Sequence, residues 1–303
     1  MLAIIIPFYK LTYFEETLQS LANQTDKRFK VYIGDDSSPE NPLDLLGKFK
    51  EKFDFVYYKF DKNVGGISLV KQWDRCIALS QKEEWLMILG DDDYLGENAI
   101  ALWYKNYNEF YKKAEVIRFA TKAIDQKKKE ISEAYEHPVW EYATDAFLRK
   151  YYYSTRSSLS EYIFSKESYN KYGFYDYSLA WYSDDRAWLD FSDNKPIFTI
   201  NESIIFIRFS ELSISGKADN DFLKNQSKIL FYRYLIKRKL NLYKKKERLI
   251  FLRRYENDIL KTRKLSYLEW LFLLNYYIKY FEFDAFKKYS KRFLNTLLKR
   301  HEE

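Results

Sequence analysis

The stretch Trp85-Leu86-Met87-Ile88-Leu89-Gly90-Asp91-Asp92-Asp93-Tyr94-Leu95 decides how the rest of this chain is interpreted. Its first five residues form a continuous apolar run of strand length, which is typical of a buried parallel strand. The run ends in three adjacent carboxylates, which must face water or a cation. Hard oxygen ligands at the C-terminal edge of an open sheet suit Mg²⁺ or Mn²⁺ carrying phosphates. The stretch therefore predicts a metal-dependent enzyme that acts on a phosphorylated donor.

A simpler alternative is that Asp93 caps a following helix, which would run from Glu97 to about Lys113. In that case Asp91 and Asp92 would be solvated turn residues, since acidic residues are common between a strand and a helix. The choice between the two interpretations depends on the rest of the chain.

Three further strands with helices or polar turns after them precede this stretch, at Ala3–Ile6, Phe29–Ile33 and Phe55–Phe60. The second strand ends in another carboxylate pair, Asp35 and Asp36. Strand and helix alternate four times in about a hundred residues, which predicts a doubly wound, mostly parallel sheet. Right-handed crossovers place the C-terminal ends of such strands at one edge, so the acidic side chains are expected to lie together.

Four motifs in order resemble the nucleotide-sugar-binding half of the inverting glycosyltransferases of family 2, which have the GT-A fold. They are Ile4-Ile5-Ile6-Pro7-Phe8-Tyr9, Ile33-Gly34-Asp35-Asp36-Ser37-Ser38, Asn63-Val64-Gly65-Gly66 and Leu89–Leu95. The resemblance is clear over about residues 1–120 and weaker up to residue 210. It implies a Rossmann-like sheet flanked by helices in a GT-A domain at 1–212. Residues 213–303 lie beyond the resemblance and are expected to form a separate C-terminal region.

The resemblance also implies roles for single residues. Pro7 and Tyr9 match positions that border the nucleotide base, and Asp36, with Asp35 beside it, matches the acid that hydrogen-bonds the base, usually uracil. Gly65 lies in a turn that is expected to be mainly structural and only modestly close to a phosphate.

Within the triple acid, Asp91 and Asp93 match the metal-binding Asp-x-Asp signature, and Asp92 is expected near the ribose or the metal. Many members of the family carry an acid where this chain has Gly90, so which two carboxylates touch the ion stays open.

A second acidic pair, Asp184-Asp185, resembles the family's catalytic base. Inverting transfer needs a carboxylate to take the acceptor hydroxyl's proton while the metal offsets charge on the diphosphate. We expect Asp185 to be the base, with Asp184 the close competitor; alternatively one of them is only the N-cap of a helix that contains Trp188. Trp181 and Tyr182 are candidates to stack on an acceptor sugar, although aromatic residues here also serve core packing.

Charged residues are distributed unevenly along the chain. The net charge is +7, but residues from 217 onward hold 23 Lys and Arg against 10 Asp and Glu, whereas the residues before them hold 28 against 34. The basic, aromatic C-terminal region is expected to form three or four helices. They would lie on an anionic membrane surface, or pack on the catalytic domain or a dimer partner. No motif for nucleic acid is recognisable.

Composition excludes several other classes of site. Cys76 is the only cysteine, so no intrachain disulfide forms and a reducing cytoplasm is the expected location. The chain has 2 histidines, of which His301 lies near its end, so a His-based metal centre or a Ser-His-Asp triad is excluded. No stretch has the length and lack of charge that a transmembrane helix needs.

The sequence thus predicts an inverting, metal-dependent glycosyltransferase that uses a UDP-sugar and a divalent cation, Mn²⁺ or Mg²⁺. The acceptor would be a saccharide or a lipid-diphosphate-linked saccharide in surface polysaccharide synthesis, and the enzyme would be cytoplasmic or peripheral on the inner face of the membrane. The alternatives are a sugar-phosphate nucleotidyltransferase, which would usually carry a Gly-rich phosphate loop after the first strand, and an inert membrane-binding module with the same fold.

Overall fold

The computed structural model describes residues 1–210 and 220–299. It divides into two compact units, one from Met1 to Asn220 and one that begins at Asp221, and each is described by itself. The predicted domain boundary, between residues 212 and 213, lies outside the described residues.

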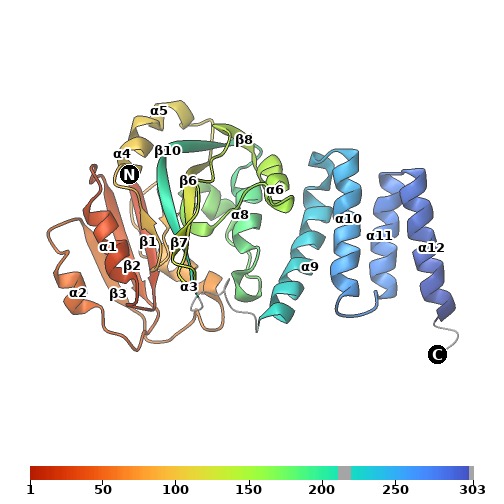
Figure 1. Cartoon of the computed structure of the whole chain (residues 1–303), viewed down its shortest axis with the longest axis horizontal. Helices are drawn as coiled ribbons and strands as arrows, with labels where there is room; N and C mark the ends of the chain where they lie inside the picture. Colours follow the sequence, from red (N-terminus) through yellow and green to blue (C-terminus); the bar gives the residue numbers. More distant parts are fainter. Residues whose placement is uncertain (211–219, 300–303) are drawn as a thin grey trace. The chain divides into compact units, whose positions relative to one another are not determined.

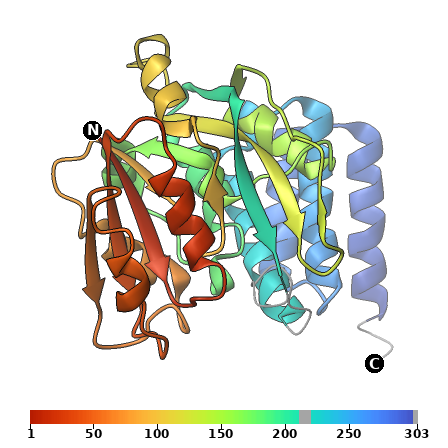
Figure 2. The ribbon, with the colours of Figure 1, turned by 60° about the vertical axis from the view of Figure 1, so that its left-hand side comes forward.

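The first unit is built around one mixed sheet (Figures 1 and 2). Its strands are β1 (Leu2–Phe8), β2 (Phe29–Asp35), β3 (Phe55–Lys59), β4 (Trp85–Ile88), β5 (Tyr94–Leu95), β6 (Val116–Asp125), β7 (Glu130–Ile131), β8 (Trp140–Tyr142), β9 (Tyr162–Ser165) and β10 (Pro196–Phe209). Its helices are α1 (Phe14–Ala22), α2 (Leu43–Gly47), α3 (Leu69–Ile77), α4 (Ala99–Lys105), α5 (Tyr107–Phe110), α6 (Ala143–Tyr151), α7 (Lys166–Tyr172) and α8 (Ser183–Phe191), with 3-10 turns η1 (Leu159–Glu161) and η2 (Ser178–Ala180).

The strand order is β3-β2-β1-β4-β9-β6-β10-β5. The first four strands in this order run parallel, as the alternating sequence pattern predicts. Strand β9 is antiparallel to both β4 and β6, while β6 and β10 are parallel to each other. The parallel half therefore gathers the C-terminal ends of β1, β2 and β4 at one edge, and β9 reverses direction beside them.

Both faces of the sheet are covered. In β1, Leu2, Ile4, Ile6 and Phe8 belong to a buried cluster with α1, α2, α4 and α5. Successive side chains of a strand point to opposite faces, so Gly34, next to the clustered Ile33, faces the other side. There it meets α3, whose Cys76 lies directly against it. Burial on both sides explains why these strands read as continuous apolar runs.

Gly34 offers a test of this packing. A Cβ at this position would overlap the Cys76 sulfur and come within 3.0 Å of the Phe60 ring, whereas a Cβ on Gly47 would meet nothing within 4 Å. We expect Gly34→Ala to lower the free energy of unfolding by about 1–3 kcal/mol through overpacking. The control, Gly47→Ala in helix α2, should be neutral or stabilise by up to about 1 kcal/mol. Urea unfolding of both variants measures the difference, and equal stabilities would contradict the packing described.

One sequence prediction needs correction. The helix expected from Glu97 to Lys113 is two short helices, α4 and α5, because the backbone leaves the helical conformation at Asn106, a residue type that competes poorly for a helix interior. Strand β10 is continuous from Pro196 to Phe209, although its pairing with β6 shifts register between Ile200 and Ile204.

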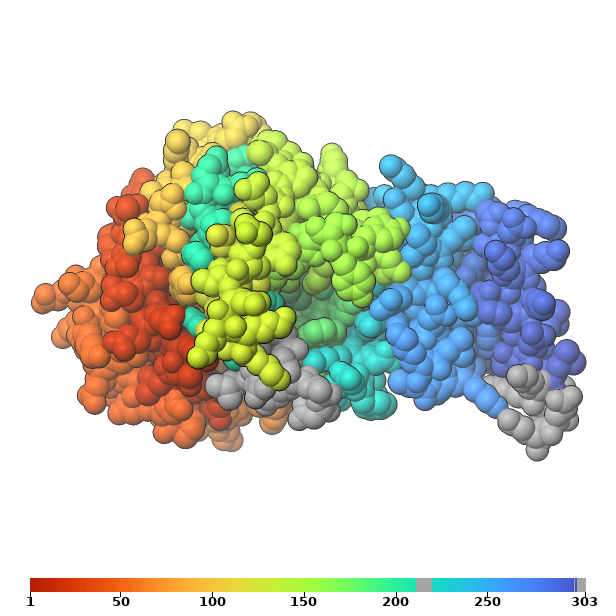
Figure 3. Space-filling view, viewed as in Figure 1, coloured from red at the N-terminus to blue at the C-terminus, as the bar shows by residue number. Residues whose placement is uncertain are grey.

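The second unit consists of the helices α9 (Asp221–Arg238), α10 (Lys245–Leu260), α11 (Tyr267–Lys279) and α12 (Phe283–Lys299), with the 3-10 turn η3 (Leu240–Leu242), drawn from cyan to dark blue in Figures 1 and 3. Each helix packs on the next. Among its buried residues are Phe251, Tyr255 and Trp270, and the fully buried Glu256 pairs with Arg253 and Arg292. No helix of residues 1–210 and 220–299 has the length and apolar character that crossing a bilayer requires.

Candidate active site

The tips of β1, β2 and β4 are joined by hydrogen bonds around Tyr9. One oxygen of Asp91, Oδ2, accepts from the backbone N–H groups of Tyr9 and Lys10 at 2.8 and 2.9 Å. From the β2 side, the hydroxyl of Ser38 donates to the carbonyl of Tyr9 at 2.7 Å, and the backbone N–H of Asp36 donates to the carbonyl of Phe8 at 3.0 Å. The predicted nucleotide-binding residues of β1, β2 and β4 therefore lie at the same sheet edge, with the Tyr9 side chain 38% exposed.

The two acids after β2 have different partners. Asp35 is fully buried and accepts from the Ser38 N–H at 2.7 Å and the Tyr57 hydroxyl at 2.6 Å, so it shapes the turn. Asp36 accepts from the N–H groups of Val64 and Gly65 at 2.7 and 2.8 Å.

Two neighbours complete the surroundings of Asp36. Arg75 pairs with it, and a Cβ on Gly65 would come within 2.5 Å of its Oδ2, so glycine permits this close approach. The Gly65 turn is thus fastened to the tip of β2, in line with its expected structural role.

The third acid after β4 is held by an arginine that the sequence analysis missed. Asp93 is 7% exposed, and its Oδ1 accepts from the Arg208 backbone N–H at 2.8 Å. The Arg208 guanidinium donates to the Asp92 carbonyl at 2.9 Å and to Glu16 at 2.5 Å. Asp93 caps no helix, because α4 begins after Asn98. A single arginine directly after the apolar run Ile204-Ile205-Phe206-Ile207 was the available signal, since such a charge must find partners when buried.

The triple acid carries charge that protein groups offset only in part. Burial raises the pKa of all three carboxyls, and repulsion from Asp93 and Asp91 adds to burial in raising the pKa of Asp92 to about 8. A divalent cation would relieve this repulsion, and carboxylate oxygens are the ligands that Mg²⁺ and Mn²⁺ prefer. Among the described residues, no three His, Cys, Asp or Glu side chains form a ready-made metal centre. Protein carboxylates and donor phosphates would therefore have to share such an ion.

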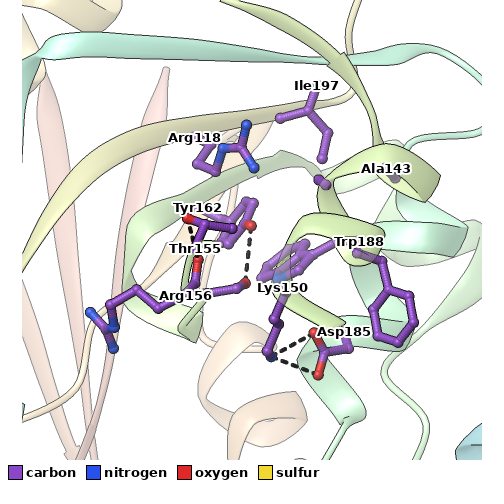
Figure 4. A pocket seen from close by; sticks show the side chains of 12 residues that line it. Arg118, Ala143, Lys150, Thr155, Arg156, Tyr162, Asp185, Trp188 and Ile197 are labelled. Atoms are coloured by element: carbon purple, nitrogen blue, oxygen red, sulfur yellow. Dashed lines mark hydrogen bonds and ion pairs between the residues drawn. The ribbon is translucent and has the colours of Figure 1, made fainter. Parts of the chain in front are cut away.

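The second acidic pair opens helix α8. Asp185 is 6% exposed, and both its oxygens accept from the Lys150 ammonium, at 2.7 and 2.8 Å (Figure 4). Burial, together with the charge of Asp185, raises the pKa of Asp184 to about 6. Neither acid is the N-cap, which is Tyr182 and makes no side-chain capping bond. The alternative that the pair only caps the helix is therefore wrong.

The backbone before this pair is unusual. Leu179, Ala180 and Tyr182 have φ angles of 60°, 51° and 73°, a region that residues with a side chain rarely adopt. Such strain persists only where the surrounding structure enforces it, and it concentrates at functional sites. This backbone conformation also sets the direction in which the Trp181 and Tyr182 side chains project.

A small cavity lies beside Asp185. Its volume is about 20 Å³, and it is lined by Arg118, Ala143, Ala146, Phe147, Lys150, Thr155, Arg156, Ser157, Tyr162, Asp185, Trp188 and Ile197 (Figure 4). Trp188 stacks on Tyr162 at 4.1 Å between ring centroids and is 4% exposed, so it packs in the core rather than against a sugar.

The segment that contains η1 and β9 borders both acidic clusters. The N–H of Gly90 donates to the hydroxyl of Ser160 at 3.0 Å, and a hydrogen bond from Ser160 lowers the pKa of Asp93 against the larger effect of burial. Ser160 lies in η1, directly before β9, whose Tyr162 lines the cavity of Asp185. Because β9 is antiparallel to β4, the residues at its start lie beside the C-terminal end of β4, between the triple acid and the cavity of Asp185.

Comparison with known proteins identifies the region that carries these residues. The model of the family described as "Glycosyl transferase family 2" matches residues 3–182. A poly(ribitol-phosphate) beta-glucosyltransferase of Bacillus spizizenii is 32% identical over 107 residues, which cover 34% of this chain and 16% of that protein. The poly(ribitol-phosphate) beta-N-acetylglucosaminyltransferase TarS of Staphylococcus aureus is 29% identical over 102 residues, 32% of this chain and 17% of TarS. The chain thus matches only about a sixth of the length of these relatives.

Solved structures extend the likeness over the whole fold. TarS residues 1–349 in complex with UDP-GlcNAc give a TM-score of 0.66 at 15% identity, covering 94% of this chain and 82% of that one. GalNAc-T7 with UDP, GalNAc and Mn²⁺ gives 0.53 at 12% identity, covering 78% and 50%. At these identities the likeness concerns the fold, and it confirms the GT-A architecture with a helical C-terminal region that the sequence predicts.

Proposed function

The chain belongs to glycosyl transferase family 2, and on that premise we propose that it transfers a sugar from a UDP-sugar, with inversion, to a hydroxyl group of a surface polymer. The observation that carries this proposal is the placement of two acidic clusters along strand β9: Ser160, just before it, contacts the cluster suited to a diphosphate with its cation, and Tyr162, within it, borders the cavity of Asp185, the acid suited to proton transfer. The relatives named for poly(ribitol phosphate) favour a polyol-phosphate or saccharide acceptor.

The donor would lie over the tips of β1, β2 and β4. Pro7 and Tyr9 would border the base, and Asp36 and Gly65 would lie near the nucleoside, as the family resemblance implies. Asp91 and Asp93, with Asp92 beside them, would hold Mn²⁺ or Mg²⁺, because burial and mutual repulsion raise their pKa values and a bound cation would stabilise the ionised carboxylates. When bound, such an ion would neutralise charge on the departing diphosphate.

The proton transfer is assigned to Asp185. The acceptor hydroxyl oxygen forms a bond to the anomeric carbon while the bond from that carbon to UDP breaks, and the hydroxyl proton passes to the Asp185 carboxylate. Attack from the face opposite the leaving group inverts the anomeric carbon. Asp184, whose pKa is raised to about 6, is the alternative acceptor of the proton. Trp181 and Tyr182, whose rings lie 6.4 Å apart between centroids, are proposed to contact the acceptor.

Turnover of nucleotide-sugars tests the proposal. Purified protein should release UDP from at least one member of a panel of UDP-sugars supplied with Mn²⁺ and a poly(ribitol phosphate) or saccharide acceptor. A nucleotidyltransferase would instead release pyrophosphate from UTP and a sugar phosphate. Binding of UDP without turnover of any donor would support the inert module and contradict our proposal.

We further propose that the basic helical unit binds anionic membrane surfaces, which would place the enzyme on the cytoplasmic side of the membrane. Exposed apolar side chains on α11, namely Leu268, Leu271 and Ile278, accompany the basic charge of this unit. The full chain should float with liposomes that contain anionic lipid and remain at the bottom with neutral ones, and 0.5 M salt should weaken binding by screening. Failure to float with anionic lipid would leave packing or dimerisation as the role of these helices.

A further inference from the structure

We propose that Lys150 is a positioning residue for sugar transfer, which holds Asp185 ionised and in a fixed orientation so that it can accept the acceptor's proton. The inference rests on the proposed function, because it takes Asp185 as the base. Nothing in the family motifs includes Lys150, which lies 35 residues before its partner in the sequence.

The geometry of the pair is specific. Lys150 reaches from α6 across to α8, and its ammonium contacts both carboxylate oxygens, at 2.7 and 2.8 Å (Figure 4). Two contacts fix the rotation of the carboxylate, which a single hydrogen bond would not do. A carboxylate has about four lone-pair positions, so one on each oxygen remains for a hydroxyl of the acceptor.

A cation in contact offsets the cost of burying the Asp185 carboxylate. Asp185 is 6% exposed and borders a cavity whose other walls include Ala143, Phe147 and Trp188. Removal from water favours the neutral form of a carboxyl group, and a neutral Asp185 could not take a proton. The Lys150 ammonium, in direct contact with both oxygens, supplies a compensating positive charge.

The other charged and titratable groups around Asp185 do not replace Lys150. Asp184, its neighbour on α8, carries the same charge and repels it. Arg118 on β6 already pairs with Glu141 at 2.8 Å, and Tyr162 on β9 is neutral at physiological pH. The Arg156 side chain extends away from Asp185 (Figure 4).

Lys150 itself stays charged in this setting. Burial opposes its charge, but the attraction of Asp185 and Asp184 outweighs burial and raises the pKa of Lys150 above its ordinary value. The ammonium is therefore present throughout the pH range in which a transferase works, and Asp185 is the member of the pair whose protonation changes during the reaction.

The test compares charge with shape at position 150. We expect Lys150→Met and Lys150→Gln to move the acid limb of the pH profile of kcat to higher pH, because these variants lack the positive charge that favours an ionised carboxylate beside it. At a pH below the shifted limb, kcat should fall about tenfold or more. Lys150→Arg should keep the limb near its original pH, and the KM for the UDP-sugar should change little in all three variants.

Lys171→Met is the matched control. Lys171 pairs with Asp193 at 2.9 Å, but both side chains are substantially exposed, at 55% and 34%. Its loss should leave the pH profile unchanged. Melting curves identify any variant that fails to fold, and Lys150→Gln then serves in place of Lys150→Met.

Two failures are distinguishable. If the limb stays in place in folded Lys150→Met and Lys150→Gln while Asp185→Asn is inactive, the base assignment stands and the role proposed for Lys150 is wrong. If Asp185→Asn keeps its turnover, the base assignment fails first, and the proposal for Lys150 fails with it.

Discussion

Asp185→Asn is expected to abolish sugar transfer while leaving the affinity for the UDP-sugar nearly unchanged. An amide has the shape of the carboxylate but cannot take the proton of the acceptor hydroxyl, and loss of a general base typically lowers kcat by about 10²–10⁴-fold. Donor binding should persist because the nucleotide residues lie at the tips of β1, β2 and β4. The measurements are kcat with saturating donor and acceptor, and the Kd for the UDP-sugar by calorimetry.

Asp190→Asn is the control on the same helix. Asp190 pairs with Arg186 at 3.4 Å within α8, and its amide variant should retain near-normal turnover. Asp184→Asn separates the two candidates. A nearly inactive Asp184→Asn together with an active Asp185→Asn would transfer the role of base to Asp184.

Asp93→Asn should remove the contribution of Mn²⁺ to UDP binding. The amide oxygen can still accept from the Arg208 N–H, so the local fold is expected to survive, but the negative charge that attracts the cation is reduced. Calorimetry should show that Mn²⁺ strengthens UDP binding by tenfold or more in the original chain. In Asp93→Asn, the titrations of UDP with and without Mn²⁺ should nearly coincide.

Asp44→Asn provides the comparison, because Asp44 is an exposed acid of α2 in the same unit. It should show the same gain from Mn²⁺ as the unaltered chain. If UDP binds equally well with and without Mn²⁺ in the unaltered chain, the assignment of a metal to the triple acid is contradicted, whereas the base assignment is not affected.

The sequence was sufficient for the parallel half of the sheet because its signals are local. The apolar runs of β1, β2 and β4 are buried on both faces, and each ends in a polar turn that can be read directly. The acids that follow must meet at one edge once the strands are parallel and adjacent.

The partners of those acids were not predictable in the same way. Arg208 reaches Asp92 and Asp93 from more than a hundred positions away, through strand pairing that no local pattern specifies. Lys150 looked like one of many surface lysines, because only the packing of α6 on α8 brings it to Asp185. Arg208 and Lys150 have these roles because each lies against a buried carboxylate. Which carboxylate a basic side chain meets depends on the completed fold.

Gly90 constrains how this site can be redesigned. A Cβ there would come within 2.9 Å of Asp92 Oδ1 and 3.2 Å of Asp93 Oδ2. The Asp93 carboxylate is held by the Arg208 N–H of β10 and cannot move easily. An engineer who wishes to install an acid at this position, as many members of the family have, would first have to shorten or redirect residue 92. A single-site library at position 90 should therefore return few active clones, whereas a library that varies positions 90 and 92 together should return more.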